Sequence, residues 1–202
     1  MKVTFQPKEG NRDRWEICID GEKWREVHGV IFGRNPVFPP ISSEKNLEST
    51  FNAYEYRRVK GYVLWRLSSK SYHSEQLAKL LSERLVQSQT IVDVIQEYRE
   101  MGFLDDEAWL QSFIHSQQKR YGLRFILNKL HTKGLSSETI QRLANDWINP
   151  DQEVQAICHL IRTRYHSKNL NDYKTRQKVM ASLARKGYAF EQIQTAFKFN
   201  QN

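Results

Sequence analysis

One turn pattern recurs four times along the 202-residue chain and limits the folds that it can adopt. In every copy a large apolar residue lies four positions before a central residue, a bulky residue follows it directly, and an acid lies four positions after it. The central residues of the copies are Ser71, Gly102, Gly134 and Gly187. A glycine there can take the left-handed conformation that ends a helix, and the acid suits the first turn of the next helix. The pattern therefore predicts tandem helical units that bury each other's apolar faces.

The residues after each turn predict where the next helix begins. Ser74-Glu75, Asp105-Asp106 and Ser137-Glu138 each place a capping residue before an acid. The copy at Gly187 is followed by Ala189, which lacks a capping hydroxyl. We interpret Asp105-Asp106 as a helix cap and not as a metal or general-base pair, because it directly follows a helix-ending turn.

Residues 1–32 have the pattern of a small β-sheet. Apolar residues alternate with polar or small ones before Asp20-Gly21, which is typical of a two-residue hairpin loop. The cross-strand pairs that this loop predicts are Ile17 with Trp24 and Glu16 with Arg25. An earlier strand at Val3–Phe5 can join through a turn at Gly10-Asn11. We therefore expect two or three strands, which lean on the helices or on a partner because so small a sheet is marginally stable alone.

The rest of the chain is expected to be helical. Residues 33–50 form a linker in this interpretation, since three prolines there prevent a regular helix. From 51 to 202 the apolar spacing predicts nine helices. These divide into three three-helix units, at about 51–101, 104–148 and 151–198. The predicted fold is thus mainly α, a short curved solenoid of three tandem units preceded by a small N-terminal β-hairpin or three-stranded sheet.

Cysteine usage and motifs argue against several classes of protein. Cys18 and Cys158 are the two cysteines, and they are far apart, so we expect no disulfide framework and a reducing, cytoplasmic setting. The chain shows no signal peptide and no apolar run long enough for a membrane span. Cys158 and His159 point about 100° apart on a helix, which excludes a nucleophile–base pair. The six histidines are scattered and no phosphate-binding glycine loop is present, so we expect no enzyme activity, no metal and no cofactor.

The net charge of +8 is unevenly distributed. Residues 1–50 hold eight basic and eight acidic residues, whereas 160–187 hold eight basic residues and one acid, Asp172. Residues 75–110 are acidic, with eight acids and three bases. A basic end favours phosphate backbones or an acidic protein surface. A merely solvated helix face is the alternative for each basic helix, and both interpretations stay open at this point.

The order of the turn motifs resembles the RecX family, the bacterial regulators of the RecA recombinase. The similarity spans about 60–197. It rests on these segments: Arg66-Leu67-x-x-Lys70-x-x-x-Ser74-Glu75-x-Leu77, Gly102-Phe103-Leu104-Asp105-Asp106-Glu107-Ala108, Lys119-Arg120-Tyr121-Gly122, Leu130-x-x-Lys133-Gly134-Leu135, Lys178-x-x-x-x-Leu183-x-x-Lys186-Gly187-Tyr188 and Ile193-x-x-Ala196. The chain departs from the family pattern at Lys186, where arginine is usual, at Ala189, where serine is common, and at Trp109, where Phe or Tyr is frequent.

The resemblance implies a modulator of recombination and not an enzyme. RecX-like proteins bind the RecA filament on single-stranded DNA and usually limit its growth, ATP hydrolysis and strand exchange. This places the chain in homologous recombination, DNA repair and the SOS response. The implied partners are the RecA filament and single-stranded DNA, with non-specific double-stranded DNA as a further possibility, and the resemblance favours a monomer.

The candidate binding residues are basic side chains on three stretches of predicted helix. They are Arg57, Arg58, Lys60, Arg66, Lys119, Arg120, Arg124, Lys129, Lys133, Arg162, Arg164, Lys168, Lys174, Arg176, Lys178, Arg185 and Lys186. Gly102, Gly134 and Gly187 are the structural turn residues. Four aromatic residues are candidates for base stacking, although helical spacing favours the core for them: Trp65, Tyr98, Trp109 and Tyr165.

Two other functions compete with filament binding. A helix-turn-helix protein acting on naked DNA without RecA would also have three-helix units and a basic charge. The turn recurs at most helix junctions, however, so it is an architectural connector and not one recognition unit. A purely protein-binding repeat is the third possibility. It predicts association that is insensitive to salt, whereas phosphate binding weakens steeply as salt rises.

Overall fold

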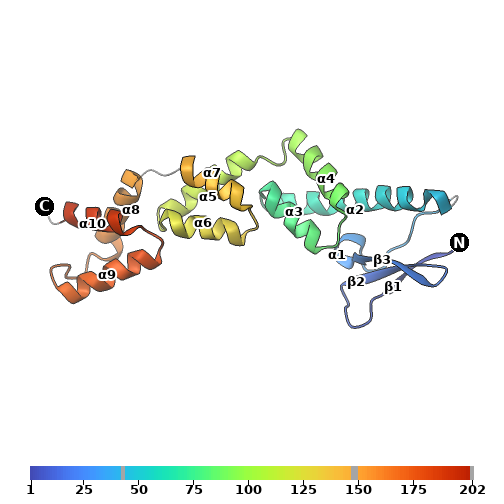
Figure 1. Ribbon diagram of the computed structural model, residues 1–202, viewed down its shortest axis with the longest axis horizontal. Helices are drawn as coiled ribbons and strands as arrows, with labels where there is room; N and C mark the ends of the chain where they lie inside the picture. The colour runs from blue at the N-terminus through green and yellow to red at the C-terminus, as the bar shows by residue number, and fades with distance from the viewer. Residues whose placement is uncertain (42–43, 147–149, 201–202) are drawn as a thin grey trace. The chain divides into compact units, whose positions relative to one another are not determined.

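The structure of the protein is a computed structural model that describes residues 1–41, 44–146 and 150–200. Within these residues it contains ten α-helices and one three-stranded antiparallel sheet, which confirms the mainly helical fold with a small N-terminal sheet (Figure 1). The chain divides into two compact units, Met1–Asp106 and Glu107–Asn202.

The first unit contains the sheet and four of the helices. The strands are β1 (Val3–Pro7), β2 (Arg14–Ile19) and β3 (Glu22–His28). The helices are α1 (Gly29–Phe32), α2 (Leu47–Ser69), α3 (Ser74–Glu83) and α4 (Ser88–Glu100), with a short 3-10 helix, η1 (Glu44–Asn46), before α2. The helix α2 begins four residues before the expected start at 51, and the buried Leu47 at its first position joins the core.

The hairpin loop is where the sequence predicts it, but the register beyond it differs. Asp20 and Gly21 both have positive φ angles, 50° and 96°, as a two-residue primed turn requires. The predicted pairs of Ile17 with Trp24 and Glu16 with Arg25 are wrong: the pairs are Ile17 with Arg25 and Glu16 with Glu26. Trp24 is the additional residue of a β-bulge, which shifts every later pair by one.

The bulge allows Trp24 to pack on the first long helix. Its ring meets Phe51 of α2 edge-on, with centroids 5.4 Å apart. Ile17 and Val27, at the next core positions of β2 and β3, are both fully buried. These strand residues share one apolar cluster with residues of α2, α3 and α4, so the sheet does lean on the helices. The four-residue α1, which is too short to show helical periodicity in the sequence, adds Phe32 to the same cluster.

Three of the four predicted turns have the expected backbone. Gly102, Gly134 and Gly187 have φ angles of 75°, 97° and 87°. In each turn the next residue donates its N–H to the carbonyl five positions earlier, for example Leu135 to Leu130 at 3.3 Å, which is a Schellman ending. The fourth prediction is wrong, because Ser71 is not left-handed and α2 ends at an extended Lys70.

The left-handed turn of the first unit lies instead between α3 and α4. Leu85 takes a φ of 61° there, and Val86 donates to the carbonyl of Leu81 at 3.2 Å. A leucine in this conformation carries steric strain, which the burial of Leu81 and Val86 in the core offsets. The pattern of glycines in the sequence contains no signal for it.

The capping residues also differ from the prediction. His73, and not Ser74, caps α3, since its Nδ1 accepts from the N–H of Glu75 at 3.2 Å. Ser136, and not Ser137, accepts from the N–H of Thr139 at the start of α7 (Ser137–Asp146). In both helices the hydrogen-bonding side chain lies one residue earlier, where the backbone is not yet helical.

Asp106 caps the N-terminus of a neighbouring helix, α3. Its Oδ1 accepts from the N–H of Ser74 at 2.6 Å, at the N-terminus of α3. Its Oδ2 accepts from the guanidinium of Arg99 on α4, also at 2.6 Å. The N–H of Ser74 and the guanidinium hold the pKa of Asp106 below its usual value although burial opposes this. The carboxylate therefore ties the starts of α3 and α5 to α4.

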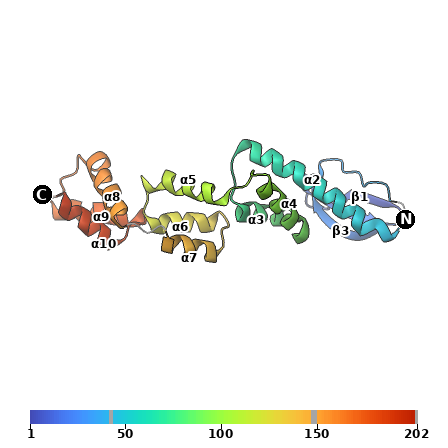
Figure 2. The same ribbon diagram turned by 90° about the horizontal axis from the view of Figure 1, so that it is seen from above.

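The second unit contains six helices in two groups. The first group is α5 (Asp106–Gln118, which starts at the last residue of the first unit), α6 (Leu123–Thr132) and α7; the second is α8 (Pro150–Arg164), α9 (Tyr173–Arg185) and α10 (Phe190–Phe199). Each group has an apolar cluster of its own, centred on Leu130 and on Leu183 respectively. Helices α6 and α7 pack side by side, as do α8 and α10 (Figure 2). Trp147, expected on a helix, lies outside the described residues.

Candidate nucleic-acid interface

The charge of the protein is concentrated in one of its two units. Met1–Asp106 contains 16 basic and 16 acidic residues, so its formal charge is zero. Glu107–Asn202 contains 15 basic and seven acidic residues and carries the whole excess of +8. The second unit is therefore the part of the chain that attracts phosphates more strongly.

Two glycines bring distant basic residues of this unit together. Gly122, just before α6, donates its N–H to the carbonyl of Lys186 at 3.0 Å. A Cβ atom on Gly122 would lie 2.4 Å from the carbonyl oxygen of Gly187, and one on Gly187 would lie 2.4 Å from the nitrogen of Phe125. Only residues without a side chain permit this approach. The turn between α9 and α10 is thereby held against the start of α6.

A second link holds α8 against the start of α6. The N-terminus of α6 has no capping side chain of its own. Glu153 of α8 supplies the acceptor, since its Oε1 lies 2.6 Å from the N–H of Leu123. Burial raises the pKa of Glu153 although this hydrogen bond opposes the shift. Its carboxyl group is thus directed at the backbone N–H of Leu123 at the start of α6.

The contact between these glycines creates a cluster of cations around two stacked rings. Tyr121 and Phe125 lie parallel, with centroids 4.1 Å apart and an interplanar angle of 10°. The Nζ of Lys186 lies 4.9 Å from the centre of the Tyr121 ring and 3.4 Å from the carbonyl oxygen of Arg120. The Nζ of Lys129 lies 5.9 Å from both ring centres. We name Arg120, Tyr121, Phe125, Lys129 and Lys186, with Arg164 described next, the α6–α9 basic cluster.

The electrostatics of Lys186 show that its charge has cationic neighbours. Burial lowers the pKa of Lys186 most, and the nearby Arg164 and Arg120 lower it further. Arg120 and Lys186 are 66 positions apart in the sequence, yet the charges of Arg120 and Arg164 both act on Lys186. Like charges held together favour an anion that can neutralise them. Phosphates of a nucleic acid or carboxylates of a protein both have this chemistry.

A second basic face lies on α9. Lys174, Lys178 and Arg185 are exposed, while Val179 and Leu183 of the same helix are buried in the core of its group. The helix thus has the apolar and basic sides that its sequence predicts. Arg176 does not belong to the exposed side, since its guanidinium lies 5.4 Å from the ring centre of Phe197.

The other predicted cations of the second unit have varied surroundings. Lys133 lies 5.4 Å from the ring centre of Phe113, which itself stacks on Trp109. Lys129 also donates to Gln117 at 3.0 Å. The remaining ones are exposed, and they are Lys119, Arg120, Arg124, Arg162, Arg164 and Lys168.

The structure does not assemble the predicted cluster on the first long helix into one basic face. Arg58 donates from Nε to the carbonyl of Ile31 at 3.0 Å, and so holds α1 against α2. Lys60 forms an ion pair of 2.5 Å with Glu97 of α4. Arg66 lies among aromatic rings near the end of the helix, whereas Arg57 is exposed.

The four aromatic candidates for base stacking differ in their exposure to solvent. Tyr98 and Tyr165 are buried, and Trp109 is half-buried against Phe113, so these three serve the core as expected. Trp65 is different, because 62% of it is exposed. The sequence-based choice omitted Tyr121 and Phe125, and the interleaving of aromatic and basic residues over 119–125 is the signal that could have found them.

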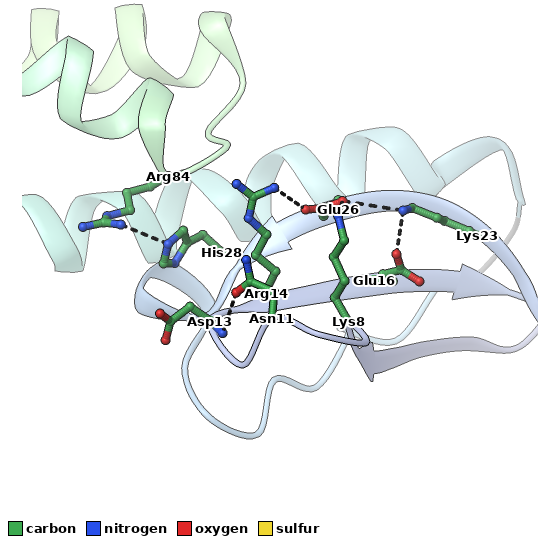
Figure 3. A network of polar contacts seen from close by, with 9 residues as sticks. All are labelled: Lys8, Asn11, Asp13, Arg14, Glu16, Lys23, Glu26, His28 and Arg84. Carbon is green, nitrogen blue, oxygen red and sulfur yellow. Dashed lines mark hydrogen bonds and ion pairs between the residues drawn. The ribbon is translucent and has the colours of Figure 1, made fainter.

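Charges on the sheet are paired with one another instead. Glu26 of β3 accepts from Lys8 and from Arg14, both at 2.7 Å, and Lys23 also bonds Glu16 (Figure 3). The hydrogen bonds from Lys8 and Arg14 lower the pKa of Glu26 to about 2. Nearby, the buried His28 lies 3.0 Å from Arg84, and burial lowers the pKa of His28. This surface offers little free positive charge to a phosphate.

Two further features bear on the class of protein. Over the described ranges, no three His, Cys, Asp or Glu residues come together as a metal site would need. In the part of the chain that the structure describes, every helix is too short or too polar to cross a lipid bilayer.

Comparison with known proteins points to one family. The model of the third three-helix domain of RecX matches residues 151–197, which contain α8, α9 and α10. The regulatory protein RecX of Herbaspirillum seropedicae is 29% identical over 140 residues, which cover 69% of this chain and 89% of the relative. The chain is similar to RecX regulatory proteins over most of its length.

Other RecX proteins are similar to this chain over a longer stretch. The regulatory protein RecX of Staphylococcus epidermidis is 26% identical over 198 residues, which cover 96% of this chain and 72% of that relative. A crystal structure of a regulatory protein RecX has the same fold, with a TM-score of 0.60, 18% identity and 98% of both chains covered. RecX from Lactobacillus salivarius also has a TM-score of 0.60, over 72% of this chain and 96% of its own.

Proposed function

We propose that this protein is a RecX regulator, which binds the RecA filament on single-stranded DNA and limits its extension, ATP hydrolysis and strand exchange. The relatives are named regulatory proteins, and regulation through a filament needs a surface for its phosphates or acidic residues. The α6–α9 basic cluster is the observation that carries the proposal. Backbone contacts of Gly122 and Gly187 bring its cations close together in the folded chain, before any partner binds.

The chemistry of the cluster fits a nucleic-acid backbone. Arg120 and Arg164 are exposed and supply guanidinium groups for phosphate oxygens. Burial and these two arginines lower the pKa of Lys186. An anion that neutralises the arginines would therefore also favour the charged form of Lys186. Positioning on phosphates does not depend on base sequence, as a regulator acting along a filament requires.

The α9 face extends the positive surface of the same unit. Lys178 and Arg185 lie on the exposed side of the helix, away from its buried residues. We assign both basic surfaces of Glu107–Asn202 to the filament, and the neutral first unit to other contacts. A plain DNA-binding protein would use the same cations, so the experiment must separate RecA from DNA.

Co-sedimentation with RecA filaments on a long thymine homopolymer tests the proposal. Arg120→Glu combined with Arg164→Glu should lower filament binding, because it places two negative charges beside Lys186. A matched control is Lys45→Glu with Lys79→Glu, which makes the same charge change at exposed residues of the first unit. The control should bind like the wild type. Far-UV circular dichroism checks that all variants keep their helices.

Salt and RecA dependence decide between the functions. Each lost phosphate contact should reduce the slope of log affinity against log salt by about 1. Binding to naked polymer that equals binding to filaments at every salt concentration would favour a DNA-binding protein that acts without RecA. Filament binding that changes neither with salt concentration nor with the Arg120→Glu/Arg164→Glu substitutions would contradict the proposed surface.

A further inference from the structure

A separate basic and aromatic surface lies in the first unit, at the end of α2. Trp65 projects there with 62% of its surface exposed, beside an exposed Leu64. The guanidinium of Arg66 lies over the ring of Trp65 and Tyr62 packs beside this ring, while Arg66 and Lys70 both lie over the ring of the buried Tyr72. We name Trp65, Arg66, Lys70 and the two tyrosines the Trp65 patch. A single exposed tryptophan is common on protein surfaces, but this one lies beside cations and other aromatic rings.

The aromatic rings of the patch hold its two cations in place. The guanidinium carbon of Arg66 lies 5.9 Å, 5.8 Å and 5.4 Å from the ring centres of Tyr62, Trp65 and Tyr72. The Nζ of Lys70 lies 4.5 Å from the ring centre of Tyr72. Tyr62 also packs against Trp65, with centroids 6.0 Å apart. Cation–π contacts of this kind orient the cations without neutralising them.

The local sequence leaves these cations without acidic partners. No Asp or Glu occurs between Glu55 and Glu75, although five basic residues do. Lys60 is paired with Glu97, and Arg58 bonds a backbone carbonyl. Among the described residues, neither Arg66 nor Lys70 takes part in an ion pair, and the Nε of Arg66 is buried without a hydrogen-bond partner. The patch is thus a positive spot in a unit whose formal charge is zero.

We infer that the Trp65 patch binds single-stranded DNA, with Trp65 stacked on an unpaired base and with Arg66 and Lys70 on the adjoining phosphates. An exposed indole beside free cations is the combination with which proteins hold single strands irrespective of sequence. Duplex DNA hides the faces of its bases, so the patch selects single strands. The inference rests on the proposed function only in taking single-stranded DNA as a partner, and it does not require RecA.

The test compares strands with and without bases. Fluorescence anisotropy measures binding of the full chain to a thymine 20-mer, to an abasic strand of equal length, and to a blunt duplex, all without RecA. Trp65→Ala should weaken binding to the thymine strand by roughly 5- to 150-fold, the range expected for one base–aromatic stack. It should leave the abasic strand and the duplex unchanged, because neither presents an accessible base face.

Two variants make the result specific. Trp65→Phe keeps an aromatic face and should restore most of the lost affinity. Val92→Ala removes another exposed apolar side chain of the first unit, 60% exposed on α4 beside Asp93, and should change nothing. Equal loss on thymine and abasic strands, or no loss on either, would overturn the stacking inference.

The RecA filament provides the remaining outcome. If Trp65→Ala weakens binding to RecA filaments but not to the free thymine strand, the patch contacts protein and the inference is wrong. The proposed function would survive that result, since it depends on the α6–α9 basic cluster. Conversely, loss of all RecA binding by the Arg120/Arg164 pair would leave the Trp65 result on free DNA intact.

Discussion

Replacing Gly187 by alanine should be the most damaging single methyl addition among the glycine turns. Gly187 has a φ of 87°, and a Cβ there would lie 2.4 Å from the nitrogen and 2.6 Å from the Cβ of Phe125. The left-handed conformation costs an L-residue about 1–2 kcal/mol. Overpacking against a backbone that cannot yield adds about 1–3 kcal/mol. We therefore expect Gly187→Ala to reduce the free energy of unfolding by about 2–5 kcal/mol.

Two other glycines separate these contributions. Gly102 has a φ of 75° with nothing within 4 Å of an added Cβ, so Gly102→Ala should show the conformational cost alone, about 1–2 kcal/mol. Gly122 has a negative φ of −78° but a Cβ would lie 2.4 Å from the carbonyl oxygen of Gly187, so Gly122→Ala should show the steric cost alone. Because both clashes occur in one contact, the Gly122/Gly187 double variant should cost less than the sum of the singles.

Urea unfolding followed by far-UV circular dichroism measures these differences in the full chain. The reasoning would be refuted by a Gly187→Ala protein that is no less stable than Gly102→Ala, or by strict additivity of the Gly122 and Gly187 variants. A functional consequence follows as well. Because this contact places Lys186 over Tyr121, Gly187→Ala should also weaken filament binding at temperatures where the helices remain folded.

The remaining predictions concern single groups. Glu55 is fully buried and accepts from Thr90 at 2.6 Å and from the N–H of Gln87, so Glu55→Ala should cost about 1–3 kcal/mol of stability by leaving these donors unpaired, as urea unfolding would show. Lys178→Glu with Arg185→Glu should weaken filament binding and leave the circular dichroism spectrum unchanged, and unchanged co-sedimentation would remove the α9 face from the interface. The pKa of Glu26 falls from 4.5 to about 2 on folding, so its stabilising effect is complete above pH 4.5 and disappears as the pH falls through about 2. Glu26→Gln should accordingly lose up to about 1 kcal/mol at neutral pH, and that loss should shrink toward zero between pH 4.5 and 2 in acid-dependent unfolding curves.

Local signals account for the parts of the fold that the sequence predicts well. The spacing of apolar residues locates all nine long helices over the described residues, and glycine marks three of the turns between them. Asp20-Gly21 likewise identifies its hairpin, because a turn with two positive φ angles tolerates few other residues. These features depend on neighbours within a few positions.

Local sequence patterns do not predict the features that depend on tertiary contacts. The bulge at Trp24 exists because the ring reaches Phe51, 27 positions away, and no local pattern records that distance. Leu85 takes a conformation that glycine usually provides, held by core packing on both sides. Capping by His73 was missed because histidine is not a usual capping residue.

For the candidate interface as well, the sequence predicts local properties but not tertiary contacts. Composition places the positive charge in the second half of the chain, but the list of cations does not show which of them meet. Lys186 and Arg120 are 66 residues apart and come together through two glycines whose contact the sequence does not reveal. On the first long helix, Arg58 and Lys60 have the right charge but are engaged by Ile31 and Glu97. Partner assignment, and not helix assignment, is therefore where sequence reasoning is weakest.

The single-stranded-DNA-dependent ATPase of RecA from the same bacterium tests the central claim most directly. This protein is titrated into the reaction at low and moderate salt, alongside the Arg120→Glu/Arg164→Glu variant. The account predicts inhibition at substoichiometric ratios that weakens with salt and is largely lost in the variant. An ATPase rate that stays constant throughout the titration, while the protein still binds naked DNA, would contradict it.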